Sequence, residues 1–160
     1  QSEHFKIGVL SQQPYIFNAT IKENVSMFEA VEDEKVIEVL AAVGLMEKIN
    51  QLPQGIETYI GEGGEMLSGG QMRRIELSRV LLAQPELVVF DEPATGLDVW
   101  TERTIQEALN TYFKESTVIM IAHRESTIRM AQRRIYMEGG HMITDDQVIS
   151  TQRDKGRDRQ

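Results

Sequence analysis

The spacing of apolar and polar residues along the chain predicts short strands that alternate with helices. Residues 87–90 are all apolar and are bounded by turn residues, which is typical of an interior parallel strand buried on both faces. Residues 117–122 predict a second buried strand, and residues 101–113 between the two predict a helix. Strand, helix and strand in this order form a crossover unit, which implies a parallel sheet. Residues 7–10 predict a further short strand that ends before Pro14.

Polar residues mark the ends of two helices in the first third of the chain. Thr20 and Glu23 have the spacing of a capping box, so a short helix should follow, through about Met27. Asp33 can cap a second helix, and Gly44 is placed to end it. The apolar residues of this second helix follow the helical period and are Val36, Ile37, Leu40, Ala41 and Val43.

The rest of the chain contains one longer helix and a hairpin. Residues 55–70 are rich in glycine and polar residues and predict a loop. Good helix formers over residues 70–83 predict a helix, which Pro85 closes. Residues 134–137 and 141–144 are joined by a glycine pair and predict a terminal β-hairpin.

Length and composition limit the class of protein. The 160 residues leave room for about one domain, which we place over residues 1–150, and the charged residues 151–160 predict a disordered tail. The 25 acidic and 17 basic residues give a net charge of −8. This charge argues against nucleic acid as a partner, because a duplex-binding protein needs a concentrated basic face. Apolar residues make up 41%, which is enough for a packed α/β core.

Two further features bear on the compartment. The chain contains no cysteine, which excludes disulfides and thiolate metal sites and fits a reducing compartment. Its apolar runs are far shorter than the roughly 20 residues that cross a bilayer, so we expect the chain itself to be soluble. Its polar start does not resemble a signal peptide, and it lacks an initiator Met, so we expect a piece of a longer protein.

Two adjacent carboxylates follow the apolar run 87–90. Ligands of open parallel sheets bind beyond the carboxyl ends of the strands, so Asp91 and Glu92 should lie at such a site. Successive side chains of a strand diverge, and the two acids can therefore have different roles. One can hold Mg²⁺ near phosphate oxygens while the other accepts a proton from an attacking water. The alternative interpretation is two solvated acids at a strand end.

A glycine-containing turn precedes the longer helix. Leu67-Ser68-Gly69-Gly70-Gln71 stands where unpaired backbone N–H groups and the positive end of the helix dipole favour an anion. Ser68 adds a hydroxyl, and the glycines allow close approach of a phosphate. Helix capping alone is the alternative. His123 follows the strand 117–122 and should emerge at the same sheet edge as the two acids, where it can contact a terminal phosphate or serve a structural role.

Together these motifs resemble the nucleotide-binding domain of ATP-binding cassette (ABC) proteins. Leu67-Ser68-Gly69-Gly70-Gln71 matches the signature motif of the family letter for letter, upstream of a Walker B strand. The resemblance runs from about Lys6 to Ile143. It implies a P-loop NTPase-like parallel sheet, a helical signature subdomain over about residues 20–80 and a C-terminal β-hairpin.

The resemblance also implies a role for each site residue, with ATP and Mg²⁺ as cofactors. Asp91 would hold Mg²⁺, Glu92 would be the catalytic base, and His123 would be the H-loop switch. Asp98 would be the acid of the D-loop. The signature motif would bind ATP in trans, on a second nucleotide-binding domain of a homodimer or heterodimer.

Three further segments match the family, and two of them resemble its exporters. Gln12 would be the Q-loop residue, contacting the metal and the reaction site, with Gln13 as the alternative. Residues 14–25 look like the exporter version of the segment that follows. Gly61-Glu62-Gly63-Gly64 resembles the X-loop, in which Glu62 would contact the transmembrane domain of the same transporter.

The chain departs from the family pattern at several positions. Glu76 and Ser78 stand where the family usually has small apolar residues, and Thr95-Gly96 replaces the commoner Ser-Ala. No G-x-x-x-x-G-K-[ST] occurs, and no lysine follows a glycine. That loop cradles the β- and γ-phosphates. We therefore expect an amino-terminal truncation, and an isolated chain that binds Mg-ATP weakly and does not hydrolyse it.

Three functional hypotheses follow. The first is the ATP-hydrolysing domain of an ABC exporter, held at the cytoplasmic face of the cell membrane through its transmembrane domain. The second is a soluble ABC ATPase, against which the exporter-like segments argue. The third is a non-hydrolysing module that supplies the signature motif in trans, against which Glu92 argues because such a module needs no base. The sequence does not identify a transported substrate.

Overall fold

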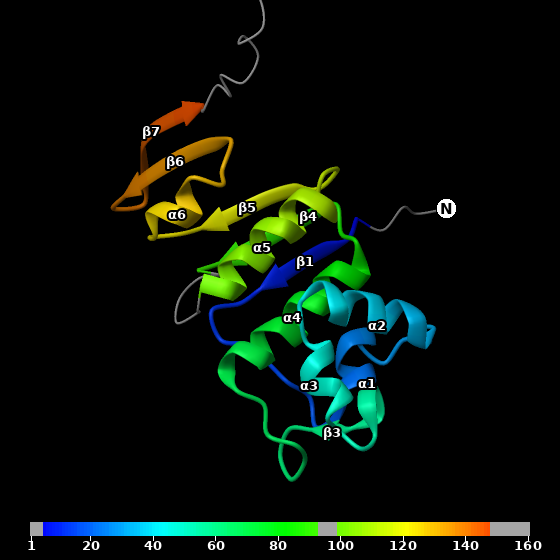
Figure 1. Ribbon diagram of the computed structural model, residues 1–160. Coiled ribbons are helices and arrows are strands. Elements are labelled where there is room, and N and C mark those ends of the chain that lie inside the picture. The colour runs from blue at the N-terminus through cyan, green and yellow to red at the C-terminus, as the bar shows by residue number, and fades with distance from the viewer. Residues whose placement is uncertain (1–4, 93–98, 148–160) are drawn as a thin grey trace, which may run out of the picture. The chain divides into compact units, whose positions relative to one another are not determined.

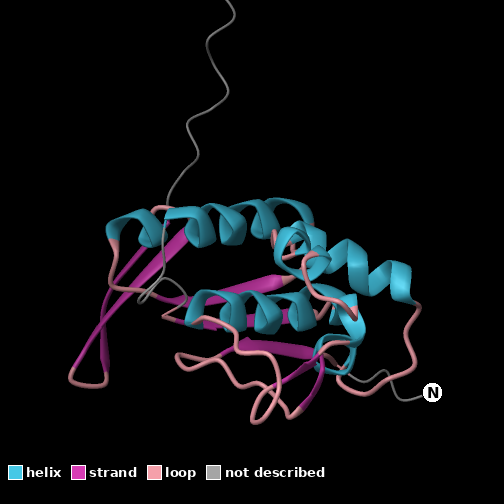
Figure 2. Cartoon of the chain, turned by 60° about the horizontal axis from the view of Figure 1, so that its bottom comes forward, coloured by secondary structure: helices cyan, strands magenta, loops and turns pink. Residues whose placement is uncertain are grey.

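The computed structural model describes residues 5–92 and 99–147 (Figure 1). It divides into two compact units, with the boundary between Ala122 and His123. The predictions for residues 93–98 and for the tail 151–160 lie outside the described residues. The described residues contain both helices and strands, and single helices and strands alternate from Tyr59 to Glu138 (Figure 2).

A three-stranded parallel sheet organises the first unit. Strands β1 (Ile7–Leu10), β4 (Leu87–Asp91) and β5 (Thr117–Ile121) lie in the order β1-β4-β5. Helix α5 (Val99–Thr111) connects β4 to β5, so the predicted strand-helix-strand unit and its parallel sheet are confirmed. The carboxyl ends of β1, β4 and β5 therefore lie along one sheet edge.

Among the described residues of the first unit, side chains bury only one face of this sheet. Leu10, Val88 and Phe90 are fully buried and belong to the same apolar core as residues of helix α4 (Gly69–Ala83). The opposite face is apolar but open, with about half of each side chain exposed, and it carries Ile7, Val9, Ile119 and Ile121. The prediction that the strands are buried on both faces is therefore wrong for the described residues of the first unit. Parallel sheets are normally covered on both faces.

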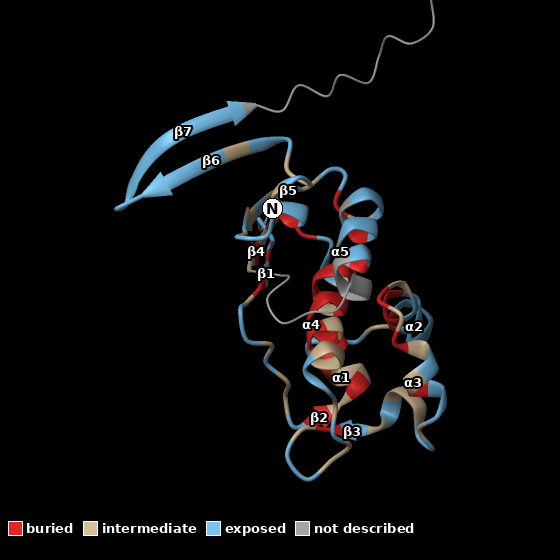
Figure 3. Cartoon of the chain, turned by 60° about the vertical axis from the view of Figure 1, so that its left-hand side comes forward, coloured by how far each residue is buried: buried red, intermediate tan, exposed pale blue. Residues whose placement is uncertain are grey.

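Further helices of the first unit contribute to the same core (Figure 3). They are α1 (Ile21–Ser26), α2 (Asp33–Ala42), α3 (Met46–Asn50) and the 3-10 helix η1 (Gly55–Glu57). Helices α1 and α2 pack against α4, α3 packs against α2, η1 packs against α1, and α3 and η1 pack against each other. Strands β2 (Ala19–Thr20) and β3 (Tyr59–Ile60) form a small antiparallel pair. The predicted loop over residues 55–70 is thus partly wrong, because η1 and β3 lie within it. Both are too short to give a periodic sequence signal.

The predicted helix ends are confirmed in part. Thr20 accepts a hydrogen bond from the backbone of Glu23, whose carboxylate accepts one from the backbone of Thr20, so the capping box is present. Asp33 was wrongly predicted to cap α2: it is the first helical residue, and its carboxylate pairs with Lys22 at 2.5 Å. Gly44 follows the end of α2 with a φ of 64°, as a terminating glycine should.

The second unit contains helix α6 (Glu125–Ile128) and the predicted hairpin of β6 (Arg133–Glu138) and β7 (His141–Gln147). Gly139 and Gly140 have φ of 55° and 80°, which suit the two-residue turn between the strands. Arg133 donates to both carboxylate oxygens of Asp145, at 2.7 and 2.5 Å. These hydrogen bonds raise the pKa of Arg133 and lower that of Asp145. Among the described helices of both units, none is long and apolar enough to span a bilayer.

Candidate nucleotide site

The two carboxylates lie at the carboxyl end of β4, as predicted. Asp91 is the last residue of the strand, and Glu92 follows it with a left-handed φ of 48°. The backbone N–H of Glu92 donates to the carbonyl of Ile121 at 3.0 Å, which ties the end of β4 to the end of β5. A non-glycine residue in this conformation carries about 1–3 kcal/mol of strain, and such residues cluster at functional sites.

The predicted Q-loop residue contacts the second carboxylate. Gln12 lies just beyond β1, and its Nε2 donates to Glu92 Oε2 at 3.3 Å. Two residues that are 80 positions apart in the chain thus meet because their parallel strands end side by side. Gln12 therefore lies beside Glu92 in the structure, and its role stays a prediction.

His123 and Asp98 were also predicted to be site residues. His123 comes shortly after β5 and is the first residue of the second unit, so its contact with the reaction site stays a prediction. Asp98 lies outside the described residues. Among the residues that are described, no three His, Cys, Asp or Glu side chains form a metal-binding group. The carboxylate of Asp91 and the amide oxygen of Gln12 suit Mg²⁺, which commonly takes one or two protein ligands together with substrate phosphates.

The predicted signature turn begins α4. Ser68 is the N-cap residue, and its hydroxyl accepts from the backbone N–H of Gln71 at 3.3 Å. The Gln71 side chain in turn accepts from the backbone N–H of Ser68 at 2.8 Å, so the turn is a capping box. Leu67 packs against the core, whereas a Cβ added to Gly69 or Gly70 would meet nothing within 4 Å. The turn therefore caps α4, and its glycine backbone borders open space. The anion site at this turn stays a prediction.

The predicted X-loop is joined to the segment before α1. The backbone N–H of Glu62 donates to Asn18 Oδ1 at 2.7 Å, and the Tyr59 hydroxyl donates to the Asn18 carbonyl at 2.7 Å. A Cβ at Gly61 would lie 2.4 Å from Asn18 Oδ1, so this close approach requires glycine. The side chain of Glu62 is exposed. The sequence analysis did not identify Asn18, whose role depends on a pairing across β2 and β3.

Arg79 of α4 contacts both α1 and the segment before it. Its guanidinium donates to the carbonyl and to the side-chain oxygen of Asn24, at 2.6 and 2.7 Å, and to the carbonyl of Tyr15 at 2.6 Å. It also lies 5.1 Å from the centre of the Phe17 ring. Burial lowers the pKa of Arg79, and the charge of Glu76 opposes that shift. Sequence reasoning missed Arg79, although a charge among apolar residues of a helix is a signal that could have found it.

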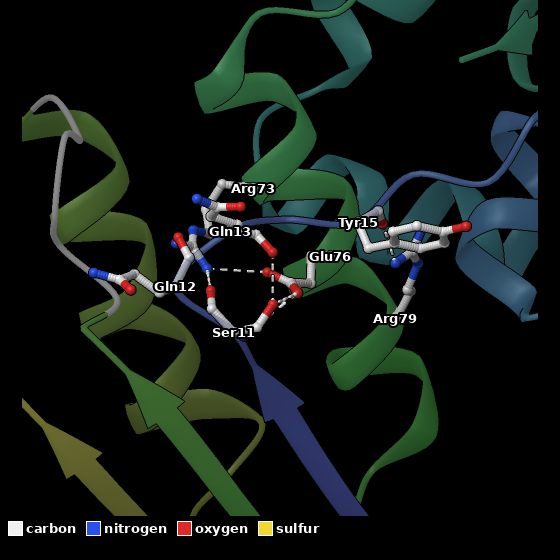
Figure 4. A network of polar contacts seen from close by, with 7 residues as sticks. All are labelled: Ser11, Gln12, Gln13, Tyr15, Arg73, Glu76 and Arg79. Atoms are coloured by element: carbon white, nitrogen blue, oxygen red, sulfur yellow. Dashed lines mark hydrogen bonds and ion pairs between the residues drawn. The ribbon is translucent and has the colours of Figure 1, made fainter. Parts of the chain in front are cut away.

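A second polar network joins α4 to the end of β1 (Figure 4). Arg73 and Glu76 form an ion pair of 3.0 Å whose side chains are only 3% and 8% exposed. Both also bind Ser11, and Arg73 binds the carbonyl of Gln12. The sequence analysis noted Glu76 only as a departure from the family and missed Arg73. Their spacing of three residues on a helix was the available signal.

The fold and the site geometry are those of a nucleotide-binding α/β domain, with acids beyond a parallel strand and a separate glycine turn at a helix start. The model of the family described as ABC transporter matches residues 1–95, and the chain belongs to this family.

Its relatives include proteins of Staphylococcus aureus that are named multidrug export ATP-binding/permease proteins. The one from strain bovine RF122 / ET3-1 is 38% identical over 139 residues, which are 86% of this chain and 24% of that protein. The proteins from strains NCTC 8325 / PS 47 and COL are 37% identical over 139 residues, which are again 86% of this chain and 24% of each of those proteins. The chain thus spans about a quarter of the length of these relatives.

Proposed function

We propose that this chain is part of the ATP-hydrolysing domain of an ABC exporter, in which ATP hydrolysis drives transport across a membrane. The observation that carries the proposal is the contact between Gln12 and Glu92 beyond the parallel strands. Glu92 has the backbone strain and the neighbouring amide expected of a general base that is held in place. The exporter-like relatives, which are named for both ATP binding and permease function, support the same proposal.

The proposed roles follow the positions of the side chains. Glu92 accepts the proton of the attacking water, and Gln12 orients that water and the carboxylate. Asp91, with Gln12, holds Mg²⁺, which neutralises charge on the phosphates during hydrolysis. His123 contacts the terminal phosphate, and Asp98 acts at the boundary between two such domains.

We also propose that the phosphate-binding Walker A loop comes from a segment outside these 160 residues. The open apolar face of the β1-β4-β5 sheet supports this, because a parallel sheet is stable when helices cover both faces. The residues of this face are half exposed, and β5 pairs with one strand only among the described residues. The isolated chain therefore lacks its main ATP anchor and hydrolyses no ATP.

A second nucleotide-binding domain completes the site. Ser68, Gly69 and Gly70 offer hydrogen-bond donors and open space but no cation, so a phosphate at this turn needs a further surface to hold it. We propose that ATP lies between the Walker motifs of one domain and the signature turn of the other, in a homodimer or a heterodimer. Hydrolysis weakens the contact to the terminal phosphate and lets the two domains separate.

A transmembrane domain is the second proposed partner, and it places the chain at the cytoplasmic face of the membrane. Glu62 and the segment before α1 are joined by Asn18, so a force on one is transmitted to the other. Tyr15 before α1 and Phe28 after α1 are 64% and 59% exposed, as expected of residues that contact a partner. A soluble ABC ATPase and a non-hydrolysing module remain the alternatives.

Glu92→Gln in the intact transporter tests the assignment of the base. The amide keeps the size of the side chain but cannot take up the proton, so the rate of hydrolysis should fall about 10²–10⁴-fold while ATP still binds. Steady-state phosphate release and equilibrium binding of labelled ATP measure the two effects. The control is Glu86→Gln. Glu86 directly precedes β4, at the end of the strand opposite to Glu92, so this substitution should leave the rate of hydrolysis unchanged. An unchanged rate in Glu92→Gln removes Glu92 from this role.

A further inference from the structure

Arg73 and Glu76 form a deeply buried ion pair, and its contribution to folding stability does not explain why charged residues stand there. The two side chains are 3% and 8% exposed and lie one turn apart on α4. Removing two charges from water is costly, and a well-packed apolar pair in the same place is often equally or more stable. The pair also binds groups outside its own helix.

Those contacts all fall on two consecutive residues at the end of β1. The guanidinium of Arg73 donates to the carbonyl of Ser11 and, at 2.6 Å, to the carbonyl of Gln12. Oε1 of Glu76 accepts from the hydroxyl of Ser11 at 2.8 Å and from its backbone N–H at 3.4 Å. The pair thus clamps the backbone on both sides of the peptide bond that precedes Gln12 (Figure 4).

The clamped backbone carries the side chain that reaches the proposed base. Gln12 Nε2 lies 3.3 Å from Glu92 Oε2, at the long end of the hydrogen-bond range. A small rotation of the Gln12 backbone therefore breaks this contact. The clamp stands on α4, the same helix that begins with Ser68, so the signature turn and Gln12 are both fixed to one rigid element.

We propose that Arg73 and Glu76 are positioning residues, which hold the Gln12 backbone so that its amide orients Glu92 and which join the movement of α4 to that of Gln12. The inference rests on the proposed function of Glu92. The fork of the guanidinium is essential, because only a planar group with several donors binds Glu76 and two carbonyls together. A lysine at position 73 keeps the charge but loses this geometry.

The test uses the intact transporter with the double variant R73M/E76L. Both charges are removed together, so no lone charge is left buried and thermal unfolding should stay close to that of the wild type. The kcat of ATP hydrolysis should fall about ten- to a hundred-fold, because small displacements of catalytic groups have effects of this size, while the KM for ATP stays the same. R73K should retain the fold and give an intermediate kcat.

The matched control is the pair of Arg103 and Glu107 on α5, which is 78% and 62% exposed and joined at 2.9 Å. R103M/E107L should change neither kcat nor KM. A stable R73M/E76L transporter with the wild-type kcat overturns the inference. If that variant does not fold, R73K decides: a wild-type kcat overturns the inference, and a lowered kcat at unchanged KM supports it. A wild-type transporter that hydrolyses no ATP overturns the proposed function itself.

Discussion

The two faces of the β1-β4-β5 sheet should respond differently to the same substitution. Val9 of β1 is 52% exposed, whereas Val88 of β4 is fully buried on the opposite face. Valine to threonine replaces a methyl group by a hydroxyl and keeps the β-branched shape that strands favour. Val88→Thr buries a hydroxyl in an apolar core, which should lower the free energy of unfolding by about 1–3 kcal/mol. Val9→Thr leaves its hydroxyl in water and should cost less than about 0.5 kcal/mol.

Urea unfolding followed by circular dichroism, at low protein concentration, measures both costs in the 160-residue chain. The same substitutions are then compared in a longer chain that includes the segment with the phosphate loop. There the cost of Val9→Thr should rise to about 1–3 kcal/mol because its face becomes covered, and that of Val88→Thr should not change. Equal costs in the short chain would refute the open face. A harmless Val9→Thr in the longer chain would show that the added segment does not cover this face.

Two further predictions concern the dimer and the hairpin. Ser68→Arg should leave ATP binding unchanged and abolish hydrolysis at the site that the altered signature turn faces. The measurement compares ATP hydrolysis by dimers that carry Ser68→Arg and loss of the Walker A lysine on the same chain with hydrolysis by dimers that carry them on different chains. Equal hydrolysis in both arrangements would disprove action in trans. Arg133→Gln should raise the pKa of Asp145 toward its ordinary value in an NMR titration, because its hydrogen bonds to Arg133 lower that pKa. Since the folded pKa is lowered, the pair stabilises the hairpin above the unfolded pKa of Asp145, and this contribution is lost as the pH falls through the folded pKa. A pKa that does not move would refute that cause.

Local signals predicted the regular elements of this protein well. The capping box of Thr20 and Glu23 and the apolar run of β4 depend on residues close together in the chain, so the local sequence was sufficient to predict them. The hairpin was predicted for the same reason, from its glycine pair. The cap at Asp33 was wrong because its carboxylate pairs with Lys22, which folding brings near. The pair of β2 and β3 was missed because neither strand is stable without the other.

The sequence by itself determined the order of the motifs, the parallel sheet and the placement of Asp91 and Glu92 at the carboxyl end of β4, because motif spacing and strand direction are properties of the chain. Only the tertiary structure decided which side chains meet across that edge. The contact of Gln12 with Glu92 and the clamp of Arg73 and Glu76 join residues more than 60 positions apart. The first contact depends on the pairing of β1 with β4, and the clamp depends on how α4 packs against the end of β1. No local pattern encodes the angle and distance of that packing.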